Sequence, residues 1–479
     1  MTKGEGNSEH KIFIYNTMGR ELQEFIPIDK NEIKMYHCGP TVYWDQQIGN
    51  LRAVVMADLI KRSIEYNSDS NGNNYKVTLV RNYTDVGHLT GDNIGDADTG
   101  EDRMDKAARR DNKTPDEIAD FYIDRYIKDI KLLNADSADY TPRATEYISE
   151  IIEMVGELLD KDFAYTTEQG VYFNVAKYSE YTRLSGQKLD LQNVGSGHGD
   201  VSDNNKINSA DFALWIFTVG SHADALQTWK SPFGLGFPGW HMECSVMAKV
   251  ILGNHFDIHM GGIEHIPVHH TNEIAQSECA NGEKYVNYWL HNEHLLIDNK
   301  KMSKSEGTAY LLSDVITFLK NYEKEKYPER RKPFLYGNIK DSTTSENYAS
   351  VLRYFFLQAH YRSKQNFTWE ALLASYTSYI KLRQKYNMLK FQSLEYNAIL
   401  EADRFDSTNY ASTYSNITFT ENDKAQFYKE KFLKAINKDF NIAMALGIMW
   451  SMIKDKEVTN AEKLELINDF NKVFGLELN

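Results

Sequence analysis

The sequence predicts an α/β protein in which a body built on a Rossmann-type parallel sheet carries an inserted connective segment and precedes an all-α helical bundle. Three observations support this fold class. A strand-like stretch at 33–43 ends in a Gly-Pro turn, a helical pattern follows over 48–66, and a second strand pattern covers 75–85. Strand, loop, helix and strand in that order are typical of the first unit of a nucleotide-binding α/β fold.

The elements that follow extend the same plan. Residues 91–133 begin as an acidic loop and become helical, and 141–165 show a further helical pattern. The stretch 190–209 is rich in Gly, Ser, Asp and Asn, which indicates a mobile loop. GNHFDIHMGG (253–262) has the pattern of a strand, and from about residue 350 the periodicity predicts four or five helices. We therefore expect an α/β domain at 10–305 with an insertion at about 90–210, a linking segment at 306–349 and a helical domain at 350–479.

Composition bounds the class of protein. With 479 residues, 42% hydrophobic and 25% charged, the chain resembles globular proteins of two or three domains. No run of about 18 apolar residues occurs, so no membrane helix is expected, and the polar first residues are unlike a secretory signal. Three cysteines, Cys38, Cys244 and Cys279, are too few for a disulfide framework and favour a reducing cytoplasm. The net charge is −14, and residues 351–479, with 17 Lys and Arg against 15 Asp and Glu, are the region best suited to a polyanion.

Histidine and acidic residues are concentrated in HIPVHHTNE (265–273). On a helix, His269 and Glu273 stand at i and i+4 and share one face. Together with Cys38, at the end of the first strand, and Cys244, they would give four ligands of types that zinc accepts. The alternative is that the histidines pack or cap a helix, and the HExxH pattern of zinc proteases is absent. DADTGED (96–102) resembles part of a calcium loop without its full pattern, which favours a solvated acidic loop.

A basic segment, KKMSKSEGT (300–308), suits a nucleotide phosphate. Lys301 and Lys304 supply charge, and Ser303 and Ser305 supply hydroxyl donors. A lysine pair by itself is more often a solvated surface. The exact five-residue string KMSKS is a far more specific signal of function than the mere presence of two lysines and two serines.

Several motifs together resemble one enzyme family. KMSKS is the second signature of class I aminoacyl-tRNA synthetases, and QIGN (47–50) stands where their first signature lies. The motifs that are similar to cysteinyl-tRNA synthetases in order and spacing are CGPTVY (38–43), GWHMECS (239–245), GNHFDIH (253–259), HHTNEIAQSE (269–278) and LRYFFLQAHYRS (352–363). The resemblance covers roughly residues 10–365. It implies that the α/β body is the catalytic domain and that the helical tail binds the tRNA anticodon.

The resemblance also implies a reaction and a set of site residues. The reaction is ATP-dependent activation of L-cysteine to cysteinyl-adenylate, followed by transfer to the 3′ end of tRNA(Cys), with Mg²⁺ accompanying ATP. One zinc ion per chain, held by Cys38, Cys244, His269 and Glu273, would bind the substrate thiolate. The residues assigned to catalysis are Gln47, Asn50, Lys301 and Lys304. Those assigned to substrate and ATP binding are Gly39, Thr41, Gly49, Thr84, Trp240, His259, Met302, Ser303 and again Lys304. A cytoplasmic monomer with no membrane association is expected.

A zinc ion in an amino-acid pocket has a physical rationale. Cysteine differs from serine only by sulfur in place of oxygen, and apolar pockets separate near-isosteres by only about 10–200-fold. Protein synthesis requires the correct amino acid to be preferred over its competitor by roughly 10⁴- to 10⁵-fold. Zinc deprotonates a coordinating thiol and prefers the soft thiolate over a hydroxyl. Discrimination can therefore be completed at the binding step, and no obvious insertion of editing-domain size is present.

The sequence departs from the family pattern in places. Gln47 replaces the first histidine of the first signature, Val268 replaces a proline, and Glu264 replaces an aspartate. About 25 residues at 322–346 look inserted, and their charge run indicates a solvated segment. Two rival readings follow: a ligase that transfers cysteine to a small amino-sugar, and a catalytically inactive relative. The helical tail favours the tRNA enzyme over the first, and intact KMSKS argues against the second.

Overall fold

The computed structural model describes residues 11–478 except 69–71, 88–101, 187–202, 204, 303–306, 327–343 and 406–422, and the side chains of 344–347 and 393–405 are likewise outside the description. Several sequence-based predictions fall outside the described residues. They are Ser303, Lys304 and Ser305 of KMSKS, residues 96–101 of the calcium-like stretch, and most of the segments 190–209 and 322–346.

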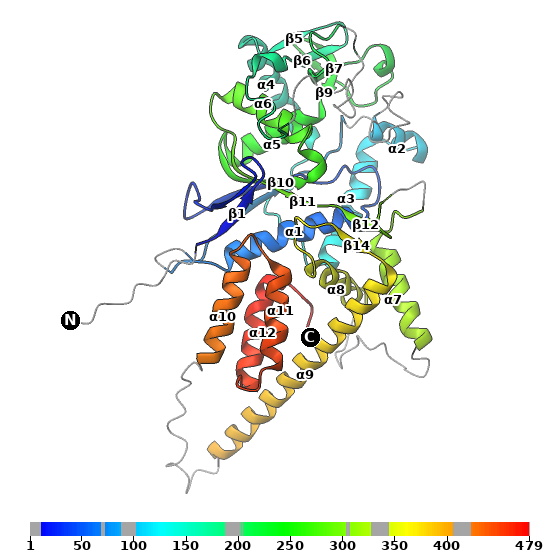
Figure 1. Cartoon of the computed structure of the whole chain (residues 1–479). Helices are drawn as coiled ribbons and strands as arrows, with labels where there is room; N and C mark the ends of the chain where they lie inside the picture. Colours follow the sequence, from blue (N-terminus) through cyan, green and yellow to red (C-terminus); the bar gives the residue numbers. More distant parts are fainter. Residues whose placement is uncertain are drawn as a thin grey trace, which may run out of the picture.

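A four-stranded parallel sheet lies at the centre of the chain, in the order β11-β10-β3-β4 (Figure 1). Its strands are β3 (Ile33–His37), β4 (Val77–Arg81), β10 (Phe256–Gly262) and β11 (Val286–Asn292). All residues of β4 are buried, as expected for a parallel strand covered on both faces. Helix α1 (Ile48–Glu65) connects β3 to β4, and α6 (His269–Asn281) connects β10 to β11. The predicted parallel α/β body is confirmed.

The long connection between β4 and β10 is divided in space: its antiparallel sheet lies at the top of Figure 1, whereas its helix at Pro115–Leu132 packs against α1. Its helices are α2 (Arg103–Asp111), α3 (Pro115–Leu132), α4 (Ile148–Asp160) and α5 (Trp240–Leu252). Its antiparallel sheet has the order β5-β6-β7-β9-β8, with strands at Ala164–Thr166, Gly170–Phe173, Phe212–Phe217, Gly234–Pro238 and Trp229–Ser231. This sheet continues past residue 210, where the insertion was expected to end. The domain boundaries themselves stay predictions.

Two small sheets join distant parts of the chain. The hairpin of β1 (Phe13–Asn16) and β2 (Glu21–Glu24) lies beside the central sheet, since Thr17 N donates to the carbonyl of Trp289. The second sheet consists of β12 (Leu295–Ile297), β13 (Lys300–Lys301) and β14 (Gln365–Phe367). β12 lies in the middle of this sheet, with β13, which contains the first residue of KMSKS, on one side and β14 on the other. Helix α7 (Leu312–Lys326) follows KMSKS.

The described part of the C-terminal tail contains five helices and the short strand β14, which confirms the predicted helical region. The helices are α8 (Thr344–Leu357), α9 (Trp369–Phe405), α10 (Asp423–Ile436), α11 (Ile442–Lys454) and α12 (Asn460–Phe474). A Thr459–Glu462 capping box starts α12, and Gly475 in the left-handed region ends it. None of the described helices is both long and apolar enough to cross a membrane.

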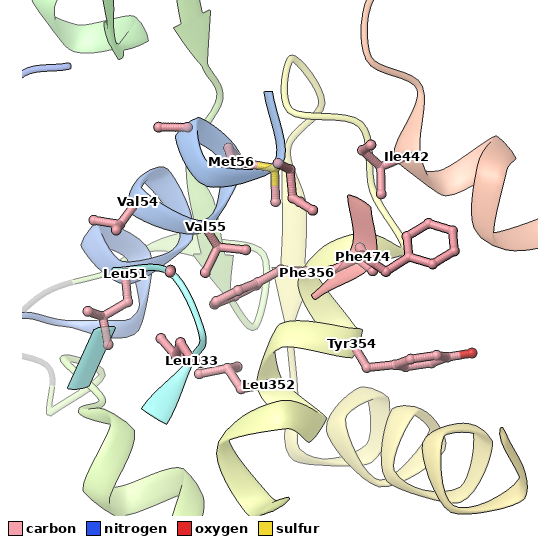
Figure 2. Close-up of a cluster of buried hydrophobic side chains, with 14 of the residues drawn as sticks. Leu51, Val54, Val55, Met56, Leu133, Leu352, Tyr354, Phe356, Ile442 and Phe474 are labelled. Carbon is pink, nitrogen blue, oxygen red and sulfur yellow. The ribbon is translucent and has the colours of Figure 1, made fainter. Parts of the chain in front are cut away.

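The tail shares one hydrophobic core with the α/β body. Figure 2 shows Val55 of α1 beside Phe356 of α8, with Phe474 of α12 in the same cluster. The buried guanidinium of Arg353 adds polar links, because it donates to Asp58 of α1 and to the carbonyls of Leu133 and Phe474. Residues near 350 therefore lie inside a packed core, and a chain ending there would leave one face of α1 uncovered.

Candidate active site and metal centre

Most of the candidate site lies at the carboxyl ends of the parallel strands, where open α/β sheets bind their ligands. Cys38 directly follows β3, and Thr84 lies in the loop after β4. His259 lies within β10 and is fully buried. The remaining donors come from two helices that lie side by side, with Cys244 on α5 and His269 with Glu273 on α6.

The structure brings the four predicted metal ligands together. One donor atom from each of Cys38, Cys244, His269 and Glu273 lies within 4.8 Å of all the others. The two sulfur atoms are 4.0 Å apart, and His269 Nε2 lies 3.0 Å from Glu273 Oε1. Glu273, His269 and Cys244 are buried, and Cys38 is partly exposed. Two thiols, an imidazole and a carboxylate within this distance form a donor set of the kind that zinc binds.

A second donor group overlaps the first. Cys38, His259, His270 and Glu273 also lie within 4.8 Å of one another. Cys38 Sγ is 3.4 Å from His259 Nε2 and 3.3 Å from His270 Nε2. Sequence reasoning missed His270, although its position next to His269 in the HH pair was a signal. His259, predicted to bind substrate, is thus close to the metal donors.

Neighbouring side chains hold both histidines of α6 in place. His241 Nδ1 lies 2.9 Å from His269 Nδ1, which leaves Nε2 of His269 toward Glu273. His291 Nε2 lies 2.8 Å from His270 Nδ1. Tyr285 OH donates to Glu273 Oε2 at 3.3 Å. Metal-binding histidines commonly have their second ring nitrogen fixed in this way.

Burial makes charge costly in this cluster. It raises the pKa of the Cys38 thiol, and the neighbouring Cys244 raises it further. Burial likewise raises the pKa of Glu273, with Cys244 as the next cause. It lowers the pKa values of His259 and His270. Without a cation these groups therefore favour their neutral forms. A divalent cation reverses that preference for thiols and carboxylates, so the residues present fit a bound zinc ion.

The predicted substrate residues surround this cluster. A Cβ atom on Gly39 would overlap the carbonyl oxygen of Asn82, so only glycine fits there, and Gly39 N donates to Asn82 Oδ1 at 2.8 Å. Thr41 and Thr84 form a parallel bridge between the loops after β3 and β4. The ring of Trp240, the first residue of α5, lies 4.3 Å from the ring of His269.

Four of the predicted nucleotide and catalytic residues, Gln47, Gly49, Asn50 and Met302, lie at the start of α1. Gln47 is the N-cap of that helix, and the first turn, Ile48–Leu51, carries no acidic residue, so the helix terminus suits an anion. Asn50 Nδ2 donates to Gln46 Oε1 at 2.7 Å. Gly49 faces Met302, whose methyl group occupies the space that a side chain at position 49 would need.

The first signature, at the start of α1, therefore contacts the KMSKS segment through Gly49 and Met302. Lys301, the residue before Met302, is exposed on β13. Gln46 was missed by sequence reasoning. Its side-chain amide also donates to the carbonyls of Thr41 and Trp44, and so fixes the loop between Cys38 and α1. A glutamine beside the first signature carries no sequence signal for that role.

Comparisons with known proteins agree with the resemblance seen in the motifs. A profile described as the tRNA synthetases class I (C) catalytic domain matches residues 24–328. A cysteine–tRNA ligase of Treponema denticola is 35% identical over 470 residues, which cover 97% of this chain and 86% of that protein. A cysteine–tRNA ligase of Lactococcus lactis subsp. cremoris is 35% identical over 467 residues, covering 97% of this chain and 87% of that protein.

Solved structures share the fold at low sequence identity. A ternary complex of Agrobacterium radiobacter LeuRS with tRNA and LeuAMS has a TM-score of 0.58 at 10% identity, and the match covers 94% of this chain and 85% of that one. A Mycobacterium tuberculosis methionyl-tRNA synthetase bound by methionyl-adenylate has a TM-score of 0.56 at 13% identity, and the match covers 92% of this chain and 89% of that one. These matches extend over both the α/β body and the helical tail.

Proposed function

Because this chain belongs to the cysteine–tRNA ligase family of class I tRNA synthetases, we propose that it activates L-cysteine with ATP and transfers the cysteinyl group to tRNA(Cys). In the first step, a carboxylate oxygen of cysteine attacks the α-phosphorus of ATP, and pyrophosphate leaves with the bonding electrons. In the second step, a hydroxyl of the terminal ribose attacks the activated carbonyl carbon, and AMP leaves. The observation that carries the proposal is the cluster of Cys38, Cys244, His269 and Glu273, of which all but Cys38 are buried.

We assign the metal role to Cys38, Cys244, His269 and Glu273. This group contains both thiols of the site, and thiolate ligands favour zinc over magnesium or calcium. When held by these residues, a zinc ion would supply the Lewis acidity that favours the thiolate form of the substrate's sulfur. Serine offers only a harder hydroxyl, so we expect it to be activated at least about 10⁴-fold less well than cysteine. Trp240 and His259 border the cluster and would enclose the amino acid.

The nucleotide would lie between the first turn of α1 and the KMSKS segment. Backbone amides at the helix start, with the Gln47 side chain, can donate to phosphate oxygens. Lys301, and Lys304 of the same motif, supply positive charge to the phosphates, and Mg²⁺ would accompany ATP. These contributions are positioning and electrostatic stabilisation, which together account for much of the catalysis in such transfers.

The metal proposal is tested by comparing two cysteine variants. Cys244→Ser should lose both bound zinc and cysteine-dependent ATP–pyrophosphate exchange. Cys279→Ser is the matched control, because Cys279 is also buried on a neighbouring helix but lies outside both donor groups. Metal analysis should find about one zinc per parent chain. Full activity in protein holding less than about half an equivalent would contradict the assignment.

Charging of tRNA tests the second step. With cysteine, ATP and total tRNA, the chain should form cysteinyl-tRNA. Cysteine-dependent pyrophosphate exchange without any charging would instead favour an acceptor other than tRNA. Absence of both reactions in zinc-loaded protein would favour the inactive relative.

A further inference from the structure

A cluster of aromatic rings and guanidinium groups borders the proposed site, and neither reaction step above uses it. It comprises Trp44 in the loop after β3, Arg110 of α2, and Phe121 and Tyr122 of α3, with Lys113 and Arg125 at its edge. We call this the aromatic–arginine face. Phe121 and Trp44 are 45% and 37% exposed, values that leave large ring surfaces accessible to a partner.

Contacts within the aromatic–arginine face are continuous. The Trp44 and Tyr122 rings stack with their centroids 6.3 Å apart, and the guanidinium of Arg110 lies 4.3 Å from the centroid of Trp44. Arg110 also donates to Tyr122 OH at 3.1 Å. Phe121 contacts Tyr122 edge-on at 5.1 Å and has the Lys113 ammonium 4.8 Å from its centroid. Planar π surfaces thus alternate with cations.

The face is fixed close to the nucleotide end of α1. Trp44 is three residues before Gln47, so their Cα atoms can be at most about 11 Å apart. Gln46 holds the carbonyl of Trp44, and the ion pair of Arg125 with Asp45 ties the same loop to α3. The Trp44 end of the face therefore lies close to the nucleotide end of α1, and Arg110 and Tyr122 contact Trp44 directly.

The chemistry of the face fits one class of partner. Unpaired nucleotides stack their bases on aromatic rings and guanidinium planes, while their phosphates take nearby cations. Residues 103–113 carry five basic and two acidic side chains, whereas residues 115–126 carry one basic and four acidic ones, so the positive charge of the face lies on its α2 side. Asp111 and Asp45 pair with Arg110 and Arg125, but exposed ion pairs are weak and do not prevent contact with phosphate.

We propose that the aromatic–arginine face binds the unpaired nucleotides at the 3′ end of tRNA and guides the terminal ribose toward the aminoacyl-adenylate. This inference rests on the proposed function, since that reaction requires an RNA 3′ end at the site. The face acts in the transfer step only, because amino-acid activation involves no RNA. Phe121 and Arg110 are the side chains that stack with bases, and they are positioning residues.

The experiment compares two reactions in the full-length, zinc-loaded protein. Phe121→Leu keeps apolar bulk but removes the π surface, Arg110→Ala removes the guanidinium plane, and Phe121→Tyr restores a ring. Cysteine-dependent ATP–pyrophosphate exchange should stay within about twofold of the parent for all three. The kcat/KM for tRNA(Cys) should fall about 5- to 150-fold for Phe121→Leu and Arg110→Ala, the range that stacking of one base supplies. Phe121→Tyr should charge tRNA nearly as well as the parent.

Two exposed positions at the opposite edge of the sheet serve as matched controls. Ile28 and Lys76 precede β3 and β4, so they lie at the amino ends of the strands. Ile28→Ala and Lys76→Gln should change neither reaction. Parent-like charging by Phe121→Leu and Arg110→Ala would overturn the inference and leave the proposed function standing. Equal loss of exchange and charging would also overturn it. A parent protein without cysteine-dependent exchange would instead count against the proposed function itself.

Discussion

Two adjacent histidines present the sharpest question at the scale of single residues. His269 and His270 each place Nε2 within 4.0 Å of Glu273 Oε1, and each belongs to a possible donor group that includes Cys38. Only the group with His269 contains Cys244. The choice between these groups decides which imidazole binds zinc and which one borders the substrate.

We predict that His269→Gln lowers bound zinc well below one per chain, whereas His270→Gln retains it. The reason is that His269 completes the group with two thiols, which zinc favours. Metal analysis of both purified variants gives the answer, with Cys279→Ser as a control for handling. Zinc loss in His270→Gln alone would assign the metal to the group with His259 and His270.

Gln47 is the second residue to test. It is the N-cap of α1, and within the described part of the chain its side chain makes no capping bond. One neutral hydrogen bond to an ATP oxygen is worth about 0.5–1.5 kcal/mol. Gln47→Ala should therefore slow cysteinyl-adenylate formation by up to about tenfold, and Gln47→His should equal or modestly exceed the parent. Single-turnover measurements at saturating ATP test this, and a parent-like rate for Gln47→Ala would show that only the backbone contributes.

At the scale of elements, the contact between α1 and the KMSKS segment sets the geometry for ATP. Gly49 lies in the first turn of α1, where alanine would ordinarily favour the helix. The Met302 methyl group nevertheless fills the space for a side chain. We predict that Gly49→Ala displaces Met302 and slows adenylate formation by up to about 100-fold without loss of stability.

A second substitution makes that prediction specific. Met302→Ala in the Gly49→Ala background should recover part of the rate of adenylate formation, because it removes the methyl group that would clash with the new side chain at position 49. Gly156→Ala is the matched control, since Gly156 lies in α4 with open space around its position. Equal rates in Gly49→Ala and the parent would mean that the segment adjusts freely and that this contact does not position ATP.

The whole molecule is held together through α1. Asp58 and Arg353 are both fully buried, and their ion pair at 2.6 Å joins α1 to α8. Burial by itself would raise the pKa of Asp58, but the guanidiniums of Arg353 and Arg62 outweigh it and leave that pKa below its ordinary value. A depressed carboxyl pKa stabilises the fold above the unfolded-state value, near 4, and this contribution is lost as the pH falls through the folded-state value.

We predict that Asp58→Asn lowers the free energy of unfolding by about 3–5 kcal/mol at pH 7, because Arg353 stays buried without its partner. The difference between variant and parent should shrink below about pH 4. Asp120→Asn removes the exposed partner of Arg143 and should cost under about 1 kcal/mol. Urea unfolding at several pH values tests both. A pH-independent difference would show that the charge of Asp58 is not what joins α1 to the tail.

The sequence by itself determined the first strand–helix–strand unit, the helical tail and the chemistry of the metal donors. Cys38, Cys244, His269 and Glu273 could be named in advance because the motifs that contain them resemble those of a known family. Ligand chemistry and the i, i+4 spacing of His269 and Glu273 agree with that set but left packing of the histidines as an alternative. The parallel body and the helical tail could also be predicted, and both are confirmed. They could be predicted because the hydrophobic periodicity along each segment is a local property of the sequence.

The tertiary structure decided what no local pattern contains. His259 and His270 join the donor cluster only because β10 and α6 pack beside the loop that carries Cys38. The short strands of the antiparallel sheet, separated by long connections, gave no clear period along the chain. A helix's periodicity shows which face is buried, but not its partner, so the packing of α8 and α12 on α1 appears only in three dimensions. The aromatic–arginine face likewise exists only where the loop after β3 meets α2 and α3.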